Sequence, residues 1–369
     1  FVEQAVVRPR HIEVQILADS YGDVVHLFDR DCSVQRRHQK VVEIAPAPGM
    51  PRELISRLCH DAITFAREVD YSAAGTVEFL VWADPDARAE AHEAGYGYAF
   101  IEMNPRIQVE HTVTEQVTGI DIVKAQIRLL EGEVIGTPAS GVPLQQDIRL
   151  NGNAIQCRVT TEDPEQNFIP DYGRITAYRE ATGFGVRLDG GTAYAGAIVT
   201  RFYDPLLEKI TCWAPSPEEA IARMHRALRE FRIRGVATNL AFLENIITHP
   251  DFVENRYTTR FIDTTPALFD FRQRQDRATK LLNYVADVTI NGHPEVRDRP
   301  RPPADAIEPM VPDYPPLSVI EGSRQILDRD GPKGLAAWMK AQKRVLFTDT
   351  TMRDAHQSLL ATRMRSFDI

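Results

Sequence analysis

The sequence predicts a mixed α/β and α+β protein of two or three domains, and three observations lead to this expectation. The chain has 369 residues, and a domain typically takes about 150 residues. Strand-like alternation and helical stripes of apolar residues both occur before residue 270. Between Pro294 and Pro316 the chain holds 8 prolines, a density that excludes a helix or a central strand and predicts a linker.

The composition is that of a globular protein with an acidic balance. With 52 acidic and 43 basic residues, the formal charge is −9, and 43% of the residues are hydrophobic. These values exclude a disordered tail, a collagen-like chain and a small disulfide-stapled scaffold. The acidic balance argues against a broad nucleic-acid or anionic-membrane surface, and no apolar run approaches the roughly 18 residues of a membrane span. We therefore expect neither nucleic acid nor membrane as a partner.

Cysteine usage indicates a reducing compartment. The four cysteines (Cys32, Cys59, Cys157 and Cys212) are scattered and form no CxxC pair. A bacterial cytoplasm is the expected location, or the mitochondrial matrix if the source is eukaryotic. Because the chain begins at Phe1 and stops in mid-pattern at Ile369, we expect a piece of a longer protein.

The first hundred residues predict a hairpin, a helix and a second strand pair. His11–Leu17 alternates polar and apolar residues, and a Tyr-Gly-Asp turn leads into a strand at 24–28. Residues 52–69 carry a helical apolar stripe. Two apolar runs, Thr76–Trp82 and Tyr98–Asn104, predict an antiparallel pair.

The remainder of the chain predicts short strands followed by helices. Asp121 is placed to cap a helix that ends near Gly132, and residues 150–213 read as short strands broken by Gly and Pro. Ser216-Pro-Glu-Glu219 has the capping residues of a helix start. Beyond the prolines we expect a short helix near 333–342 and a strand at 345–351.

Two glutamates in the middle of apolar strands are candidates for a metal site. Burying Glu78 and Glu102 without a cation would cost several kcal/mol. With Asn104 nearby, they offer the hard oxygen ligands that suit Mg²⁺ or Mn²⁺. The alternative is that both side chains face solvent on a half-exposed sheet.

The segment from Glu102 to His111 holds six polar side chains in ten residues and is a candidate anion pocket. Arg106 and Gln108 suit a small anion, and Glu110 suits a general base. A polar loop with ordinary salt bridges explains the pattern equally well.

Two further segments carry candidate chemistry. Residues 31–40 group Arg36, Arg37, His38 and Lys40, which fits phosphate or bicarbonate binding or a solvated basic face, whereas RNA binding is disfavoured because aromatic residues are not interleaved. Residues 348–357 place polar side chains after an apolar strand, as at the catalytic end of a parallel barrel. Asp354 is there either a metal ligand or a helix N-cap.

Several of these strings together resemble the biotin carboxylase family, which uses the ATP-grasp fold. They are Arg10-His-Ile-Glu13, the 31–48 block, Gly75-Thr-Val-Glu78, and Phe100-Ile-Glu-Met-Asn-Pro-Arg-Ile-Gln-Val-Glu-His111, with a likeness that continues through Gln156-Cys-Arg158 to about residue 270. Thr348–Arg363 resembles the opening of the carboxyltransferase barrel that acts on 2-oxo acids. Both on one chain, in this order, resemble the pyruvate carboxylase family.

The resemblance implies a division of the chain into three parts. Residues 1–270 would be a biotin carboxylase domain without its N-terminal subdomain and lid, 271–343 an allosteric and linker domain, and 344–369 the first strand of a TIM-type carboxyltransferase barrel. The implied function is part of an ATP-driven, biotin-dependent carboxylase that converts pyruvate and bicarbonate to oxaloacetate. Without the lid, we expect the isolated chain to be inactive.

The resemblance also implies roles for residues of the biotin carboxylase part. Mg²⁺ or Mn²⁺ bridging the ATP phosphates would be bound by Glu78, Glu102 and Asn104, and the nucleotide would lie by His11, Gln35 and His38. Bicarbonate would be held by Lys40, Arg106, Gln108 and the backbone of Val109. Glu110 would deprotonate bicarbonate, with Arg106 also catalytic, and Arg158 would stabilise the biotin enolate. Phe184 and Arg187 match a homodimer interface, so the parent protein is expected to be a homo-oligomer, a tetramer built through this dimer.

The later segments receive roles in the same way. Asp354 would bind Zn²⁺ or Mn²⁺ in the barrel, while Arg353 and Gln357 would contact pyruvate or biotin. Activation by acetyl-CoA would involve Arg232, Arg234, Arg274, Asp276 and Arg277. The biotin carrier domain lies elsewhere in such a parent chain, and the insert 84–97 is longer than this family leads us to expect.

Two other functions stay open at this point. The first is the biotin carboxylase component of an acyl-CoA carboxylase, which residues 345–363 disfavour. The second is a non-catalytic nucleotide-binding or regulatory module, which the intact set of Glu78, Glu102, Arg106, Glu110 and Arg158 disfavours.

Overall fold

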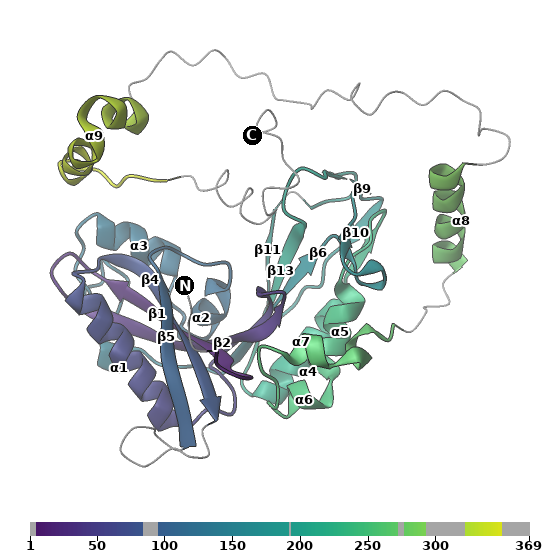
Figure 1. Cartoon of the computed structure of the whole chain (residues 1–369), viewed down its shortest axis with the longest axis horizontal. Helices are drawn as coiled ribbons and strands as arrows, with labels where there is room; N and C mark the ends of the chain where they lie inside the picture. The colour runs from purple at the N-terminus through teal and green to yellow at the C-terminus, as the bar shows by residue number, and fades with distance from the viewer. Residues whose placement is uncertain (1–4, 84–94, 192, 272–276, 293–321, 349–369) are drawn as a thin grey trace. The chain divides into compact units, whose positions relative to one another are not determined.

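The computed structural model describes residues 5–83, 95–191, 193–271, 277–292 and 322–348 (Figure 1). The chain divides into two compact units, of which the first extends to Asp270 and the second takes in Phe271–Thr348. The predicted linker at 294–316 and most of the insert, residues 84–94, lie outside the described residues.

An eight-stranded sheet organises the first unit, in the order β11-β13-β6-β3-β2-β1-β4-β5. Every neighbouring pair in it is antiparallel. Its strands are β1 (Arg10–Ala18), β2 (Val24–Arg36), β3 (Gln39–Ala45), β4 (Ala73–Ala83), β5 (Tyr96–Asn104), β6 (Asn153–Thr160), β11 (Val186–Gly190) and β13 (Leu206–Ala214). The predicted hairpin at 11–28 and the predicted pair 76–82 with 98–104 are confirmed as β1–β2 and β4–β5.

The two faces of this sheet differ in chemistry because side chains alternate along a strand. In β1, Ile12, Val14 and Ile16 form one core with α1 (Arg52–Glu68), whose apolar stripe is the predicted one. The opposite face of β1 carries His11, Glu13 and Gln15, and all three lie among polar partners. One face of the sheet is therefore a hydrophobic core, and the other face holds a buried polar layer.

A β-bulge sets which residues of β2 join the polar layer. The pairing of β1 with β2 shifts by one residue between Val14 and Ile16, opposite Phe28, which has a positive φ of 62°. The shift places Glu13 opposite Arg30, whereas the unshifted register from Leu17 and Val25 would have placed it opposite Asp29. An extra residue in one strand has this effect because it moves every later side chain to the other face.

Helices and short strands complete the first unit. The helices are α2 (His111–Thr118), α3 (Ile122–Leu130), α4 (Pro217–Glu230), α5 (Leu240–Thr248), α6 (Pro250–Val253) and α7 (Phe261–Thr264). Three small strand pairs accompany them: β7 (Glu162–Asp163) with β8 (Ile169–Pro170), β9 (Gly173–Arg174) with β12 (Ile198–Val199), and β10 (Ala177–Arg179) with β14 (Arg232–Arg234). The predicted caps are confirmed, since Asp121 accepts from the Lys124 amide and Ser216 from the Glu219 amide.

The second unit differs from the prediction at two places. Its helices are α8 (Arg277–Asn291) and α9 (Ser323–Lys340), so the helix predicted at 333–342 begins ten residues earlier and kinks at Gly331, which has a φ of 69°. The strand predicted at 345–351 is wrong for Val345–Thr348, which form no strand, and residues 349–351 lie outside the described residues. A strand needs a neighbour for its backbone hydrogen bonds, and none of the described segments pairs with this one. Across the described residues, no helix has the length and apolar character to cross a bilayer.

Candidate active site

The polar layer of the sheet contains four buried glutamates. Glu13 and Glu43 are fully buried, Glu110 is 2% exposed and Glu78 is 4% exposed. They come from β1, β3, the residue before α2, and β4. Four carboxylates in one interior require cations, because an unpaired buried charge is strongly unfavourable.

Lys40 is the cation that joins three of these glutamates. Its Nζ lies 2.7 Å from Glu110 Oε1 and 3.1 Å from Glu78 Oε1, and it also donates to Glu13 Oε1. Burial lowers the pKa of Lys40, but the carboxylates of Glu13 and Glu110 outweigh it, so the pKa lies above its ordinary value. Lys40 is therefore a permanent ammonium at the centre of the cluster.

Arg158 is a second cation that contacts Glu110, and Glu43 holds its side chain in place. Its Nη2 donates to Glu110 Oε2 at 3.0 Å, and its Nε donates to Glu43 Oε1 at 2.6 Å. The other oxygen of Glu43 accepts from Gln156 Nε2 at 2.8 Å. These contacts fix the Arg158 guanidinium plane relative to Glu110.

Glu110 remains ionised despite its burial. Burial and the neighbouring Glu13 carboxylate raise the pKa of Glu110, but Lys40, Arg158 and Arg30 outweigh them, and the net pKa lies below the ordinary value. A carboxylate is the form that a general base needs.

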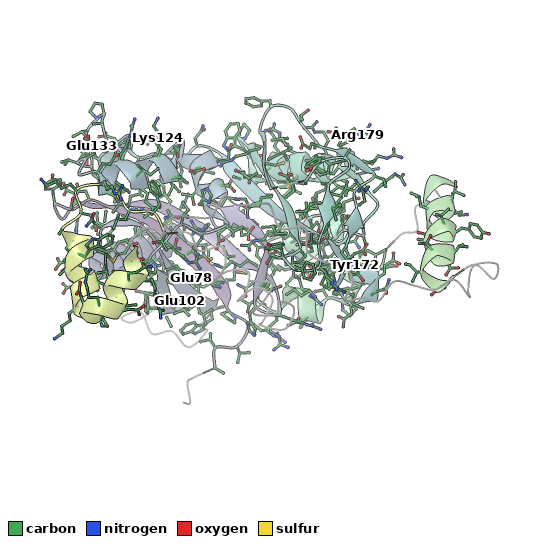
Figure 2. All side chains as sticks on the ribbon, turned by 90° about the horizontal axis from the view of Figure 1, so that it is seen from above. Glu78, Glu102, Lys124, Glu133, Tyr172 and Arg179 are labelled. Atoms are coloured by element: carbon green, nitrogen blue, oxygen red, sulfur yellow. The ribbon has the colours of Figure 1, made fainter. Side chains whose placement is uncertain are left out.

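The two candidate metal ligands lie side by side, as Figure 2 shows for Glu78 and Glu102. They face each other across β4 and β5, and Asn104 Nδ2 donates to both carboxylates at 2.9 and 3.1 Å. Of the two alternatives left open by the sequence, burial holds for Glu78 and exposure for Glu102. Two carboxylates converging on one polar atom, with an amide oxygen available by rotation, fit a hard divalent cation.

His11 contacts a carboxylate of this layer as well. Its Nε2 lies 2.8 Å from Glu78 Oε2, and its Nδ1 lies 2.9 Å from Gln35 Nε2. Burial lowers the pKa of His11, but the Glu13 and Glu78 carboxylates raise it by more, and the net pKa is about 9. His11, Glu13 and Glu78 also place ligand atoms within 4.8 Å of one another, but the Lys40 ammonium already binds both of these carboxylates.

Some of the residues expected to bind nucleotide and anion point into the polar layer, and the others make contacts elsewhere or are exposed. Gln108 is buried and donates from Nε2 to Glu78 Oε1 at 2.7 Å. Arg106 instead donates to the carbonyl of Ile107, and the Val109 carbonyl accepts from Lys209 Nζ at 3.2 Å. Within the basic block, Lys40 points into the site, whereas Arg37 and His38 are exposed in the turn between β2 and β3.

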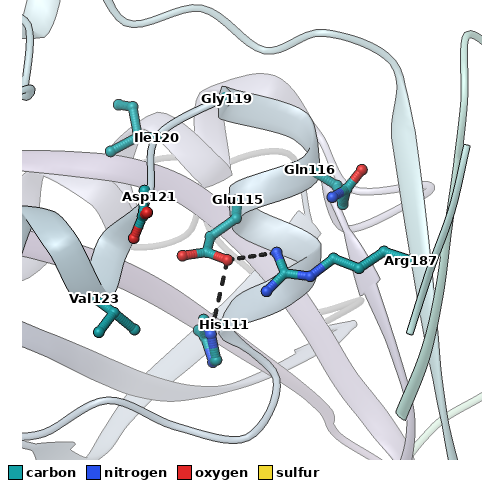
Figure 3. Close-up of a pocket in the computed structure, with 8 residues that line it drawn as sticks. All are labelled: His111, Glu115, Gln116, Gly119, Ile120, Asp121, Val123 and Arg187. Atoms are coloured by element: carbon teal, nitrogen blue, oxygen red, sulfur yellow. Dashed lines mark hydrogen bonds and ion pairs between the residues drawn. The ribbon is translucent and has the colours of Figure 1, made fainter. Parts of the chain in front are cut away.

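Of the two expected dimer residues, Arg187 lines a pocket of about 390 Å³ (Figure 3). Arg187 Nη1 donates to Glu115 at 2.6 Å, and the same Glu115 oxygen lies 3.8 Å from His111 Nε2. The pocket is lined by His111, Glu115, Gln116, Gly119, Ile120, Asp121, Val123 and Arg187. Phe184 is 79% exposed, and its ring packs edge-on against Trp213.

The expected activator and barrel residues are only partly described. Arg232 and Arg234 lie in β14, where they pair with Arg179 and Ala177 of β10. Arg277 is the first residue of α8. Arg274, Asp276, Arg353, Asp354 and Gln357 lie outside the described residues.

The sequence did not single out three buried charged residues of this site. Glu13, Arg30 and Glu43 are each fully buried and contact residues that it did single out. A signal was present for Glu13, which lies at a polar position of the alternating run 11–17. Arg30 carried no such signal, because the bulge at Phe28 breaks the alternation.

Comparisons with known proteins first define the class. Residues 1–137 match the model of the carbamoyl-phosphate synthase L chain ATP-binding domain, and residues 156–264 match the biotin carboxylase C-terminal domain. The biotin carboxylase domain of a Hydrogenobacter thermophilus 2-oxoglutarate carboxylase, solved with MgADP and bicarbonate, is 42% identical. The match covers 73% of this chain and 56% of that domain's chain, with a TM-score of 0.66. This chain is thus homologous to biotin carboxylases.

Pyruvate carboxylases match the whole chain. That of Bacillus subtilis is 50% identical over 100% of this chain and 31% of its own length, and the human mitochondrial one is 49% identical. The crystal structure of the Rhizobium etli enzyme is 65% identical with a TM-score of 0.71, and the match covers 33% of that chain. The chain thus spans about a third of the length of these relatives, and the matched domain models assign its residues up to 264 to their biotin carboxylase portion.

Proposed function

We propose that this chain supplies the residues that activate bicarbonate with ATP for transfer to biotin, as part of a ligase. The observation that carries the proposal is the contact of Glu110 with both Lys40 and Arg158 inside a layer of buried carboxylates. A base flanked by two fixed cations suits an anionic substrate, which would otherwise be repelled by four glutamates.

The proposed reaction assigns a task to each side chain. Glu110 removes the proton of bicarbonate, whose oxygen then attacks the γ-phosphate of ATP to give carboxyphosphate and ADP. Lys40 presents its positive charge to the bicarbonate oxygens, and the Gln108 amide offers them an N–H donor. Arg158 presents a fixed positive charge beside Glu110, where the carboxyl acceptor must come. Biotin, when bound, supplies the nitrogen that accepts the carboxyl group.

Glu78, Glu102 and Asn104 would hold the Mg²⁺ or Mn²⁺ of the nucleotide. The convergence of both carboxylates on the Asn104 amide supports this set. The cation would neutralise phosphate charge during the transfer. The related biotin carboxylase domain solved with MgADP and bicarbonate supports both ligands.

Pyruvate is the proposed final carboxyl acceptor, with oxaloacetate as product, because pyruvate carboxylases match the whole chain.

We further propose that residues 271–343 form an acetyl-CoA-responsive region and that 344–369 begin a carboxyltransferase barrel with its own Zn²⁺ or Mn²⁺. Arg277→Ser in the full-length gene product should then weaken activation by acetyl-CoA and preserve turnover without it. An unchanged activation curve would remove Arg277 from this role.

The test is bicarbonate-dependent ATP cleavage by the full-length gene product. Glu110→Gln keeps the size of the side chain but removes the base, so the rate should fall by about a hundredfold or more. Glu131→Gln, an exposed change just after α3, is the matched control. If Glu110→Gln cleaves ATP at the full bicarbonate-dependent rate, the assignment of the base is refuted. If the wild type shows no bicarbonate-dependent ATP cleavage, the proposed function is refuted.

A further inference from the structure

Arg30 is the largest fully buried side chain among the described residues. It lies in β2, after the bulge, and its guanidinium uses all five N–H groups. The acceptors are Glu13 Oε2 at 2.8 Å, Gln15 Oε1 at 2.9 Å, Thr76 Oγ1 at 3.0 Å, Thr114 Oγ1 at 3.2 Å and Gln108 Oε1 at 2.6 Å. Arginine is seldom buried without any exposed surface. A guanidinium with all five N–H groups bonded inside the protein therefore requires an explanation.

Charge balance explains the bond from Arg30 to Glu13, because the single charge of Lys40 is shared by Glu13, Glu78 and Glu110. It does not explain the other bonds of the guanidinium. A counter-ion for Glu13 would need no contact with Gln108, which belongs to a different segment 78 residues further along the chain. The shortest bond of the guanidinium is nevertheless the one to Gln108.

The bonds to Arg30 and to Glu78 together fix which end of the Gln108 amide faces the site. A guanidinium only donates hydrogen bonds, so it can bind only the amide oxygen. The amide nitrogen must then point the other way, where it donates to Glu78 Oε1 at 2.7 Å. A bicarbonate ion near Lys40 and Glu110 would meet an N–H donor from Gln108 and not a repelling carbonyl oxygen.

We propose that Arg30 is a positioning residue for bicarbonate, which acts by holding the Gln108 amide in the donating orientation. The inference rests on the proposed function, because it concerns the anion that this site would bind. Arg30 is itself held by Gln15, Thr76 and Thr114 on three other elements, so its guanidinium cannot turn away. The bulge at Phe28 is what brings Arg30 onto this face of the sheet.

The test compares Arg30→Lys with a matched control in the full-length gene product. Lysine keeps the charge beside Glu13 but lacks the planar fork that reaches Gln108. The KM for bicarbonate should rise about tenfold, and the KM for ATP should stay within about twofold, as expected for the loss of one charge-assisted bond. Arg10→Lys is the control, because Arg10 is also buried, donates to Asp31 at 2.8 Å and lies on the opposite face of the sheet.

A double substitution separates orientation from general damage. On a Gln108→Ala background, Arg30→Lys should change the KM for bicarbonate by less than about twofold, because its target is gone. Full additivity of the two changes would overturn the proposal. So would an unchanged KM for bicarbonate in Arg30→Lys, or an equal rise in both KM values in Arg30→Lys and Arg10→Lys.

Two further measurements keep the proposal testable in other circumstances. If Arg30→Lys does not fold, Thr76→Val and Thr114→Val each loosen the guanidinium, and each should raise the KM for bicarbonate alone; no change in either overturns the proposal. If the wild type cleaves no ATP, the proposed function fails, and a crystal structure of Arg30→Lys decides this inference separately. A second conformer of Gln108 supports it, and one unchanged orientation refutes it.

Discussion

A single buried carboxylate outside the candidate site should make the stability of this protein depend on pH. Asp29 lies in β2 on the face covered by α1 and is 1% exposed. Its Oδ2 accepts from the Ala47 amide at 2.7 Å, while its Oδ1 has no hydrogen-bond partner among the described residues. The nearest cation, Arg52 Nη1, is 4.0 Å away on a largely exposed side chain. We therefore predict that Asp29→Asn relieves an electrostatic penalty.

The magnitude follows from the shift in pKa. Burial raises the pKa of Asp29 from 3.8 to about 6, against the opposing effects of the Ala47 amide and Arg52. Because the folded pKa is above the unfolded one, the folded state is favoured below pH 3.8 and loses stability as the pH rises through 6. The total loss is about 3 kcal/mol, of which about 2 kcal/mol falls between about pH 4.5 and about pH 8.

The assay is urea unfolding of wild type and Asp29→Asn, followed by tryptophan fluorescence at both pH values. Trp82 and Trp213 report on this unit because they lie in β4 and β13. The free-energy difference between the two proteins should move by about 2 kcal/mol in favour of the variant from the lower to the higher pH. Asp23→Asn, at an exposed position before β2, controls for the charge change. A difference that stays constant within about 0.5 kcal/mol would refute the reasoning.

Three other predictions concern the full-length gene product. Glu102→Gln should raise the Mg²⁺ concentration for half-maximal ATP cleavage by about tenfold or more, as a metal titration would show, and an unchanged titration would exclude Glu102 as a ligand. Glu43→Gln removes the charge that holds Arg158 Nε, so biotin-dependent turnover should fall about tenfold while the KM for ATP is kept; an equal effect on both would indicate general damage. Phe184→Asp should weaken self-association in sedimentation, since it charges an exposed apolar ring, and an unchanged oligomer would place the interface elsewhere.

Local patterns in the sequence were sufficient for most elements of the first unit. The alternation of residues 11–17, the stripe of 52–69 and the caps at Asp121 and Ser216 depend on neighbours within a few residues, and each of these predictions is confirmed. The strand predicted at 345–351 failed for its described part because a strand depends on a partner that no local pattern specifies.

The same distinction applies to the candidate site. The residues Glu78, Glu102, Gln108 and Glu110 were accessible from the sequence, because charged or amide side chains in apolar strands and in a dense polar segment are conspicuous. Arg158 was indicated only by the resemblance. Their roles came from the resemblance to a family and remain proposals. The sequence did not show that Lys40 joins three glutamates, because these residues are separated by 27 to 70 positions along the chain.

The sequence by itself indicated Glu78, Gln108 and Glu110 of the buried polar layer, and the tertiary structure decided which charges join them and face one another. Asp29, Arg30 and Asp31 are consecutive, and nothing local indicates which of them lies opposite Glu13. The bulge at Phe28 decides it, by shifting the register so that Arg30 meets Glu13 and reaches Gln108. The physical reason is that the side chains of a strand alternate between two faces, so a one-residue shift in pairing exchanges attraction for repulsion.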